Sequence, residues 1–351
     1  MPDKYNISFP ESSIHINLPA NCIPGEEEYY NMSLEGSIRS CSVLELDYVY
    51  ANRELILWKN NEMLPEAFAW PWLKDKLYGT TKDKLKFQVK RFIRKNTVVN
   101  EPVLWCLDGY STGGYFHWIT DILPRLWMAK QYLPEIKFAI PDYFFQYWPF
   151  ITEFFELLNV KEFLEVKSDK NYLLKKLILP TRAGNPFYIQ PIPLTEGVNW
   201  LKSEALKKSS KRVGDRLYVS RAKARFRKIL NEPDLEPILN KYGFQTIYFE
   251  DYSLADQISI CQHAKVIMGL HGAGLTNLAF LSENSKVIEI RPSAVNHMYT
   301  CFFTLSPYFK VEYNYILCNY APIPLPNEKR IDDHSVILDP EEFDCRLKSI
   351  T

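Results

Sequence analysis

The stretch VIMGLHGAGLTNLAF, residues 266–280, joins an apolar strand-like run to a helix-like run through two glycines one residue apart. Glycine permits positive φ and lets the backbone approach a phosphate without a Cβ in the way. Side chains in the first helical turn add further donors. We therefore interpret this loop as a cradle for a diphosphate, formed by His271, Gly272, Ala273, Gly274, Leu275, Thr276 and Asn277.

The glycine loop differs from two familiar phosphate-binding motifs. It is not a P-loop, because no GK[ST] follows it. It is not the dinucleotide fingerprint either, because GxGxxN lacks the third glycine and comes late in its domain. The alternative is structural: both glycines make only a tight turn, and His271 is a satisfied, half-buried residue.

A second polar cluster lies in YVSRAKARFRKILNE, residues 218–232. Arginine suits phosphate because its planar fork pairs bidentately with phosphate oxygens. A loop at the end of a neighbouring strand can face the same crevice as the glycine loop. The alternative is a solvated basic turn. The polar residues of this cluster are Ser220, Arg221, Lys223, Arg225, Arg227, Lys228, Asn231 and Glu232.

Glu289 ends the strand-like run KVIEI that follows the glycine loop. A carboxylate there could accept hydrogen bonds from the two ribose hydroxyls of a nucleotide. Alternatively, Glu289 is the ion-pair partner of Arg291, and the sequence leaves both interpretations open.

His117 and Asp121 in YFHWITDILPRL are spaced i, i+4 on an expected helix and so share one face. Such a pair can act as a general base with its orienting partner. A metal site or a hydrogen bond in helix packing are the alternatives, although no third metal ligand is visible nearby. Arg125 belongs either to the same site or to the surface.

The order of elements is clearest in the C-terminal half. Strands are expected at 216–220, 244–249, 265–270 and 286–290, with helices between them that begin near Asn231, Ser253 and Leu275. This alternation predicts a parallel, doubly wound α/β sheet with right-handed crossovers.

The N-terminal half predicts a second α/β lobe. Strands are expected in TTKDKLKFQVKRF, PVLWCLDGY, IKFAIPDYF and KKLILPTR, and helices at 115–131 and 146–158. The predicted domains are residues 1–195, an acceptor-side α/β domain, and residues 196–320, a Rossmann-like nucleotide-sugar-binding domain. Residues 321–351 form an expected tail whose short helix packs back on the N-terminal domain.

Composition and charge restrict the class of protein. The 351 residues include 42 basic and 42 acidic ones, so no global field gathers nucleic acid or anionic membrane. The N-terminus lacks the features of a signal peptide, and no run of about 18 apolar residues is present. Seven scattered cysteines without a CxxC pair indicate free thiols in a reducing compartment. We expect a cytoplasmic protein, with peripheral attachment to the inner face of the membrane left open.

In combination and in this order, YFHWITDILPRL, YVSRAKARFRKILNE and VIMGLHGAGLTNLAFL followed by VIEI resemble the glycosyltransferase family 61 proteins. That family includes bacterial capsular polysaccharide biosynthesis proteins and eukaryotic relatives. The resemblance spans roughly residues 100 to 295. It implies a GT-B fold, in which two Rossmann-like domains face each other across a cleft, with donor binding mainly by the C-terminal domain.

The resemblance also implies inverting transfer of a hexosyl or pentosyl group from a nucleotide sugar, with UDP as the expected nucleotide, to a saccharide acceptor that a lipid could carry. The sequence contains no DxD triplet to hold a metal at the diphosphate. No cofactor and no metal are expected. The positions that match the family's motifs are His117, Asp121, Ser220, Arg221, Arg227, Asn231, Glu232 and residues 271–277.

Two further functions compete with sugar transfer. A nucleotide-sugar epimerase or hydrolase shares two Rossmann-like lobes and a diphosphate site, but needs no saccharide acceptor. A non-catalytic scaffold in a polysaccharide assembly complex would need neither a diphosphate site nor a saccharide acceptor. The intact set of Arg221, Arg227 and HGAGLTN argues against a decayed site. Zero net charge argues against nucleic acid as a partner.

Overall fold

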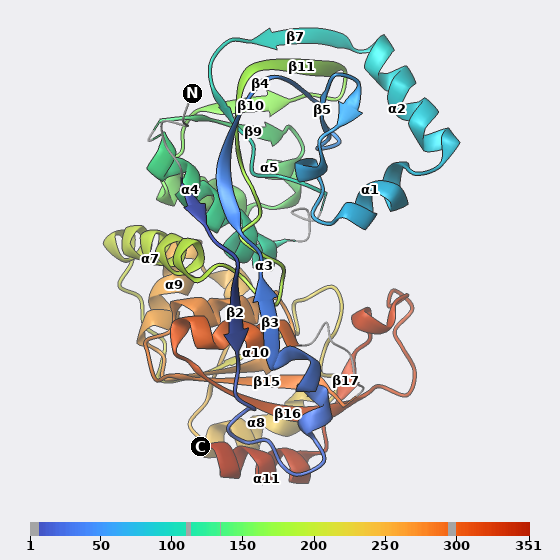
Figure 1. The fold of residues 1–351 in the computed structure, drawn as a ribbon. Helices are drawn as coiled ribbons and strands as arrows, with labels where there is room; N and C mark the ends of the chain where they lie inside the picture. The colour runs from blue at the N-terminus through green and yellow to red at the C-terminus, as the bar shows by residue number, and fades with distance from the viewer. Residues whose placement is uncertain (1–6, 110–113, 134, 294–299) are drawn as a thin grey trace. The chain divides into compact units, whose positions relative to one another are not determined.

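The computed structural model describes residues 7–109, 114–133, 135–293 and 300–351. The chain divides into two compact units, each built around its own sheet. The first unit holds residues 1–12 and 38–200, and the second holds residues 13–37 and 201–351. This division lies close to the expected boundary at 195/196, but residues 13–37 group with the second unit and not, as expected, with the first. Figure 1 shows the course of the chain.

The sheet of the first unit is mixed. Its strands follow the order β10-β9-β8-β11-β4-β5-β6, with β1 paired to β4 and β7 paired to β11. The strands β7 to β11 pair in parallel, whereas β1, β4, β5 and β6 pair antiparallel. Their bounds are β1 Ser8–Phe9, β4 Cys41–Ala51, β5 Leu57–Lys59, β6 Glu62–Met63, β7 Lys95–Val99, β8 Val103–Leu104, β9 Lys137–Pro141, β10 Phe163–Val166 and β11 Lys170–Pro180.

The helices of the first unit include one long helix that carries the proposed base. It runs from Tyr115 to Tyr132 and contains a π-helical turn, η5, at Trp118–Ile122. The expected helix at 115–131 is therefore confirmed. The helical segments are α1 Pro71–Tyr78, α2 Thr81–Ile93, α3 Tyr115–His117, α4 Leu123–Tyr132, α5 Phe144–Tyr147, α6 Phe150–Leu157 and α7 Pro191–Lys208, which continues into the second unit.

The second unit contains the predicted doubly wound sheet, in the order β13-β12-β14-β15-β16-β17. Its strands pair in parallel except for the antiparallel β17. The strands are β12 Arg216–Val219, β13 Gln245–Ile247, β14 Val266–Leu270, β15 Lys286–Pro292, β16 Glu312–Tyr320 and β17 Val336–Ile337. The main helices are α8 Glu232–Lys241, α9 Leu254–His263, the 3-10 helix η7 Ala273–Phe280, α10 Cys301–Leu305 and α11 Pro340–Ile350.

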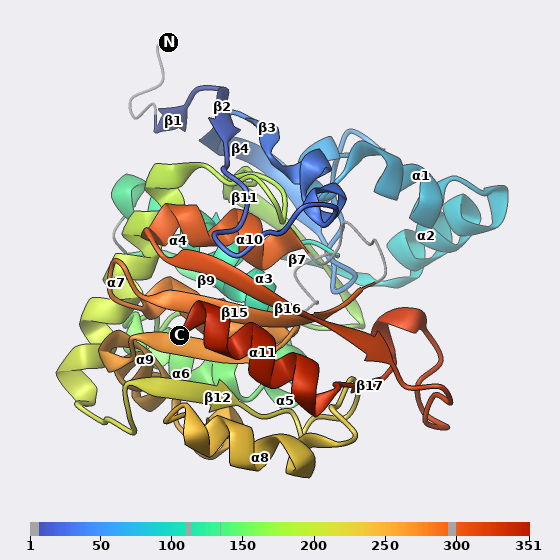
Figure 2. The same cartoon turned by 90° about the horizontal axis from the view of Figure 1, so that it is seen from below.

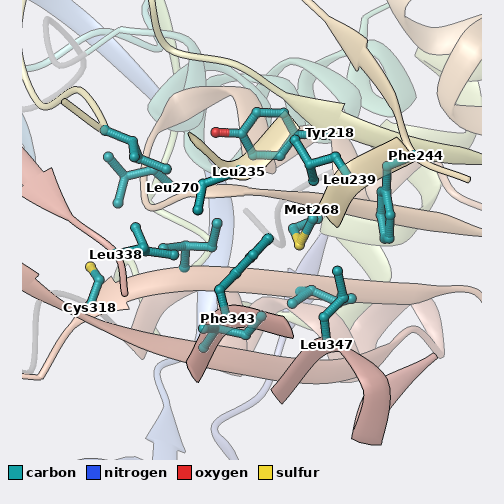
Figure 3. Packing of buried hydrophobic residues seen from close by; sticks show 14 of the residues in the cluster. Tyr218, Leu235, Leu239, Phe244, Met268, Leu270, Cys318, Leu338, Phe343 and Leu347 are labelled. Atoms are coloured by element: carbon teal, nitrogen blue, oxygen red, sulfur yellow. The ribbon is translucent and has the colours of Figure 1, made fainter. Parts of the chain in front are cut away.

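Alternate residues of the central strands point to opposite faces of this sheet. Met268, Leu270, Ile288 and Ile290 pack with residues of α8 and α11 in one buried apolar cluster, which Figure 3 shows from close by. Figure 2 shows α8 and α11 beside the sheet strands. The tail helix α11 therefore packs on the second unit's own sheet, a contact that the sequence analysis did not predict. Tail and sheet share a core, so the tail is part of this unit.

The N-terminal segment supplies the remaining elements of the second unit. The short strands β2, Ser12–His15, and β3, Glu35–Ile38, form a two-stranded sheet, and the 3-10 helices Glu27–Tyr29 and Asn31–Ser33 lie between them. The ring of Tyr30 is buried against those of Phe303 and Tyr315. The contact joins residues about three hundred positions apart.

All seven cysteines are free thiols, and five of them are buried. The expectation of free buried thiols is thus confirmed. Across the described ranges, no helix is long and apolar enough to cross a bilayer. In the same ranges, no group of three or more His, Cys, Asp or Glu residues is arranged to hold a metal ion.

Candidate active site

The strand order of the second unit reverses between β12 and β14. In open α/β sheets, ligands bind at such a reversal, beyond the carboxyl ends of the strands. Ser220 and Arg221 follow β12, and His271 and Gly272 follow β14, which pairs directly with β12. The two polar clusters predicted from the sequence therefore meet at the topological switch point of the sheet.

Arg221 is held by its own loop. Its Nε donates to the carbonyl of Arg227 at 2.8 Å, and its Nη2 donates to the carbonyl of Phe226 at 2.9 Å. Burial and the neighbouring charge of Arg227 lower the pKa of Arg221 to about 10, so it remains a cation at neutral pH. The guanidinium is thus fixed and charged at the carboxyl end of β12.

Arg227 also contacts the glycine loop. Its Nη1 donates to the carbonyl of His271 at 3.0 Å, and its backbone has a φ of +57°, in the left-handed region that costs energy for a residue with a Cβ. Among the described residues, neither the buried Nε of Arg227 nor the buried Oγ1 of Thr276 has a hydrogen-bond partner. Two buried polar atoms beside the glycine loop therefore lack a hydrogen-bond partner within the described residues.

Gly272 is required by close approach and not by its backbone angles. Its φ of 167° is extended backbone that any residue adopts, so the expected need for positive φ is wrong. A Cβ on Gly272 would lie 2.2 Å from Nη1 of Arg221. On Gly274 it would meet Cγ1 of Val219 at 3.2 Å. The first glycine makes room for the arginine, and the second packs against β12.

We expect Gly272→Ala to displace the guanidinium of Arg221 from its two carbonyl acceptors. Each such bond contributes about 0.5–1.5 kcal/mol. The free energy of unfolding should therefore fall by about 1–3 kcal/mol, measured by urea denaturation. Gly274→Ala is the matched control, since it changes the unfolded chain in the same way and its Cβ would meet only apolar atoms, Cγ1 of Val219 at 3.2 Å and Cδ2 of Phe249 at 3.6 Å. Equal losses in the two variants would contradict the packing role of Gly272.

His271 is oriented by a buried acidic residue. Its Nδ1 bonds to Oε1 of Glu289, and the hydroxyl of Tyr313 donates to Oε2 of the same carboxylate at 2.5 Å. The hydroxyl of Tyr30 lies 3.5 Å from that of Tyr313. Burial lowers the pKa of His271, and Glu289 opposes that shift. A neutral ring that donates from Nδ1 has Nε2 as its acceptor.

Glu289 makes two hydrogen bonds that the sequence analysis did not anticipate. It is completely buried, and its two oxygens bond to His271 and Tyr313. Arg291 lies instead over the rings of Tyr29 and Tyr30, at 5.4 and 5.3 Å from their centroids. The sequence signal missed here was Tyr313, whose place beside Glu289 depends on the register of β16.

The remaining residues of the arginine cluster have separate environments. The carboxyl of Glu232 bonds to the hydroxyls of Ser220 and Tyr218, and burial raises its pKa. The side chain of Asn231 donates to the carbonyl of Leu338 at 2.7 Å and accepts from its N–H at 3.2 Å. Ser220 and Glu232 are thus hydrogen-bonded to each other. Asn231 instead bonds to the segment that leads into α11.

The loop's other members are mostly buried. Asn277 donates to Oε1 of Gln257 at 3.3 Å, and Leu275 packs near Gly269. Ala273 is exposed at the start of η7, where a helix leaves its first N–H groups without intrahelical acceptors. The backbone at Ala273 therefore offers donors to an anion.

In the first unit, Asp121 is buried and lies in the π-helical turn. Its Oδ2 lies 2.9 Å from Nη1 of Arg182 and 3.9 Å from Nη1 of Arg125. Asp108 pairs with the same two arginines, at 2.8 and 3.4 Å. Asp121 thus belongs to a buried network of two carboxylates and two guanidiniums.

His117 is half-buried and lies near this network. Burial, with the positive charge of Arg182, lowers its pKa to about 4, while Asp108 opposes the shift. Burial raises the pKa of Asp121 to about 6, against the effect of Arg182 and Arg125. His117 is consequently neutral at pH 7 and able to accept a proton. Asp108 and Arg182 are the residues of this network that sequence reasoning did not assign to the site.

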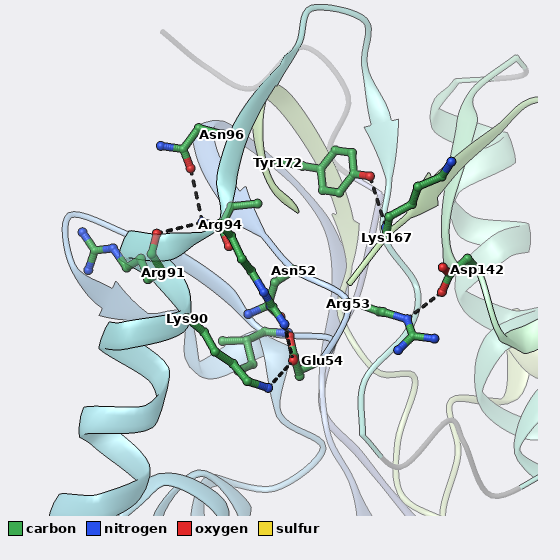
Figure 4. A network of polar contacts seen from close by, with 12 residues as sticks. Asn52, Arg53, Glu54, Lys90, Arg91, Arg94, Asn96, Asp142, Lys167 and Tyr172 are labelled. Atoms are coloured by element: carbon green, nitrogen blue, oxygen red, sulfur yellow. Dashed lines mark hydrogen bonds and ion pairs between the residues drawn. The ribbon is translucent and has the colours of Figure 1, made fainter. Parts of the chain in front are cut away.

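An open pocket of about 590 Å³ lies in the first unit. Nε of Arg53 pairs with Asp142 at 2.6 Å, as Figure 4 shows. The guanidinium of Arg53 lies 4.6 Å from the ring centroid of Tyr143. Nε1 of Trp148 lies 3.8 Å from the position of a Cβ on Gly114, which precedes the long helix. The pocket is lined by Arg53, Glu54, Tyr143, Gln146, Tyr147 and Trp148.

Comparison with known proteins finds a family model that matches part of the chain. Residues 115–288 match the family model described as Glycosyltransferase 61. The chain is similar to alpha-1,3-arabinosyltransferase XAT2 of rice, with 26% identity over 54% of this chain and 36% of the rice protein.

Two animal proteins match a shorter part of the chain. One is the EGF domain-specific O-linked N-acetylglucosamine transferase of Drosophila melanogaster, with 34% identity over 21% of this chain and 14% of that protein. The other is the human protein O-linked-mannose beta-1,4-N-acetylglucosaminyltransferase 2, with 36% identity over 23% of this chain and 14% of that protein. The chain thus matches about a third of the rice protein's length and less of the other two.

Proposed function

From the match of residues 115–288 to glycosyltransferase family 61, we propose that this protein transfers a sugar from a nucleotide-sugar donor to a saccharide acceptor with inversion. The relatives named above are sugar transferases by their descriptions. The proposal includes a GT-B arrangement of the two units, with the donor bound by the second unit and the acceptor by the first.

The observation that carries the donor site is the meeting of Arg221 and Arg227 with the glycine loop at the switch point of the sheet. Two fixed guanidiniums and the N–H groups at the start of η7 suit the charge of a diphosphate. They would stabilise the negative charge that develops on the leaving group. This supports UDP as a leaving group neutralised by protein groups.

For the acceptor side we propose His117 as the general base and Asp121 as a positioning residue. In a single displacement, the acceptor hydroxyl oxygen forms a bond to the anomeric carbon while its proton passes to His117, and the bond to the diphosphate breaks. Support comes from the neutral state of His117 and from its half-buried position. Asp121, by contrast, is buried and paired with Arg182.

The open pocket is the proposed acceptor subsite. Its aromatic rings can stack on a sugar ring, and its charged and amide groups can bond to hydroxyls. The carboxylate of Glu54 is fixed by Lys90 and Arg94, which lower its pKa to about 2 against the effect of burial. The subsite lies beside the start of the helix that bears His117.

Titration with UDP by calorimetry, with and without excess EDTA, tests the donor site. We expect binding that EDTA does not change, and Arg221→Ala should weaken it about tenfold or more, because a charge-assisted hydrogen bond contributes about 1.5–3 kcal/mol. Lys207→Ala is a control, since Lys207 lies on the surface of α7 and pairs with Glu204. Failure of UDP, GDP, CMP and dTDP to bind would overturn the donor site.

Two alternatives are separated by product analysis. An epimerase or hydrolase would turn over the nucleotide sugar without a saccharide acceptor, and a scaffold would not turn it over at all. The bacterial capsular type and the cytoplasmic location also stay proposals. The free thiols are in accord with a reducing compartment.

A further inference from the structure

The helix α2 is anchored to the first unit by one face. Phe87 is buried on that face, edge-on to Trp58 with ring centroids 5.5 Å apart. Lys90, together with Arg94 just beyond the helix, bonds to the carboxylate of Glu54, as Figure 4 shows. These contacts fix the orientation of α2, so its opposite face points away from the core.

The opposite face of α2 is apolar and exposed. Leu85, Val89, Phe92 and Ile93 are spaced i, i+4, i+7 and i+8, which places them in one stripe. Phe92 is 81% exposed, Ile93 75% and Leu85 64%. Trp72 of the neighbouring α1 is also exposed. Figures 1 and 2 both show α1 and α2 side by side.

Exposed lysines border this stripe. Lys82, Lys84 and Lys86 lie on both sides of it, and Lys95 follows the helix. The single acidic residue of α2, Asp83, hydrogen-bonds to the N-cap residue Thr80. The whole chain has a net charge of zero, so this concentration of positive charge is local.

We propose that this face, the α2 face, binds the surface of a bilayer that contains anionic lipids. The α2 face comprises Trp72, Lys82, Lys84, Leu85, Lys86, Val89, Phe92 and Ile93. A helix with an apolar stripe, flanking lysines and low net hydrophobicity lies in the plane of the interface. The lysines complement an anionic surface. This inference is independent of the proposed sugar transfer, and it would bring the enzyme to an acceptor on a lipid.

Sedimentation of the full chain with lipid vesicles tests the proposal. We expect binding to phosphatidylcholine vesicles that contain phosphatidylserine, and at least about tenfold weaker binding to pure phosphatidylcholine. Added salt should weaken binding by screening. Phe92→Ser with Ile93→Ser should lower the affinity about tenfold or more, as should Lys82→Gln with Lys84→Gln and Lys86→Gln.

Ile323→Ser is the matched control, because Ile323 is exposed in the second unit, outside the α2 face. It should leave binding unchanged. The substituted side chains are exposed, so the variants should fold, and the salt dependence of the wild type tests the proposal even if one does not. Lack of binding to anionic vesicles would overturn it. A stable dimer in solution would also overturn the proposal if the double variant Phe92→Ser with Ile93→Ser dissociates it. The α2 face would then be a protein interface.

Discussion

His117→Ala should lower kcat by ~10²- to 10⁴-fold, the usual effect of removing a positioned general base. UDP affinity should stay unchanged, because the proposed donor groups all belong to the second unit. Turnover with a UDP-sugar, combined with calorimetry of UDP binding, separates the two effects. A variant with near wild-type turnover would show that the proton of the acceptor hydroxyl goes elsewhere.

The pH profile identifies the base independently. A general base must be unprotonated, so kcat/KM is constant above its pKa in the free enzyme and falls tenfold for each pH unit below it. With the pKa of His117 at about 4, the fall should begin near pH 4. If Asp121 were the base, the fall would begin near pH 6. Tryptophan fluorescence at each pH checks that the protein stays folded.

Asp121→Asn serves as the comparison. It keeps the size of the side chain but removes the charge that pairs with Arg182. For a positioning residue, we expect a smaller loss of turnover than in His117→Ala. The fall in kcat/KM at low pH should still begin near pH 4. A larger loss of turnover than in His117→Ala would reverse the two assignments. So would a kcat/KM that no longer falls at low pH.

Glu289→Ala should lower the free energy of unfolding by about 3–5 kcal/mol, as expected when one partner of a buried ionic network is removed. The carboxylate accepts from Tyr313 and His271 in a completely buried position. Without it, two buried donors lack an acceptor, and the cation of Arg291 loses a nearby negative charge. Urea denaturation measures the loss.

Two further variants show that the effect comes from burial. Glu312→Ala removes a partly exposed glutamate from the adjacent strand, where it pairs with Lys286 at 3.3 Å, and should cost less than about 1 kcal/mol. Glu289→Gln keeps an acceptor for Tyr313, so its loss in the free energy of unfolding should lie between those of Glu289→Ala and Glu312→Ala. If Glu289→Ala were no worse than Glu312→Ala, the buried network would not stabilise the second unit.

The architecture of the second unit was predictable because local signals and the overall fold agree there. Ser253 caps α9 as expected by accepting from the N–H of Asp256, and Gly243 follows α8 with a φ of +72°. The apolar strands β14 and β15 lie where their hydrophobic runs predict. The mixed α/β class is confirmed, whereas the GT-B arrangement stays a prediction.

The first unit was harder to predict from the sequence. The segment TTKDKLKFQVKRF was expected as a strand because Leu85, Phe87 and Val89 alternate with polar residues. It forms α2 instead, and Thr80 caps it by accepting from the N–H of Asp83. In a strand those three apolar side chains would share one face, whereas the helix buries Phe87 and leaves the other two exposed.

Only those parts of the candidate site that are set by nearby residues in the sequence were predictable. Both polar loops were found because each follows its own strand, and parallel strands place their carboxyl ends at one edge. The partners Tyr30, Tyr313 and Arg182 come from distant parts of the sequence. Their positions depend on strand register and on the path of residues 13–37, which periodicity does not reveal.

During synthesis, residues 13–37 leave the ribosome before any strand of the second sheet has been made. Tyr30 can reach its buried place only after Phe303 and Tyr315 have been made, more than 270 residues later. The first unit, by contrast, is complete in sequence at residue 200. We therefore expect the first sheet to fold on the nascent chain, while residues 13–37 wait to join the second sheet, whose strands are made later.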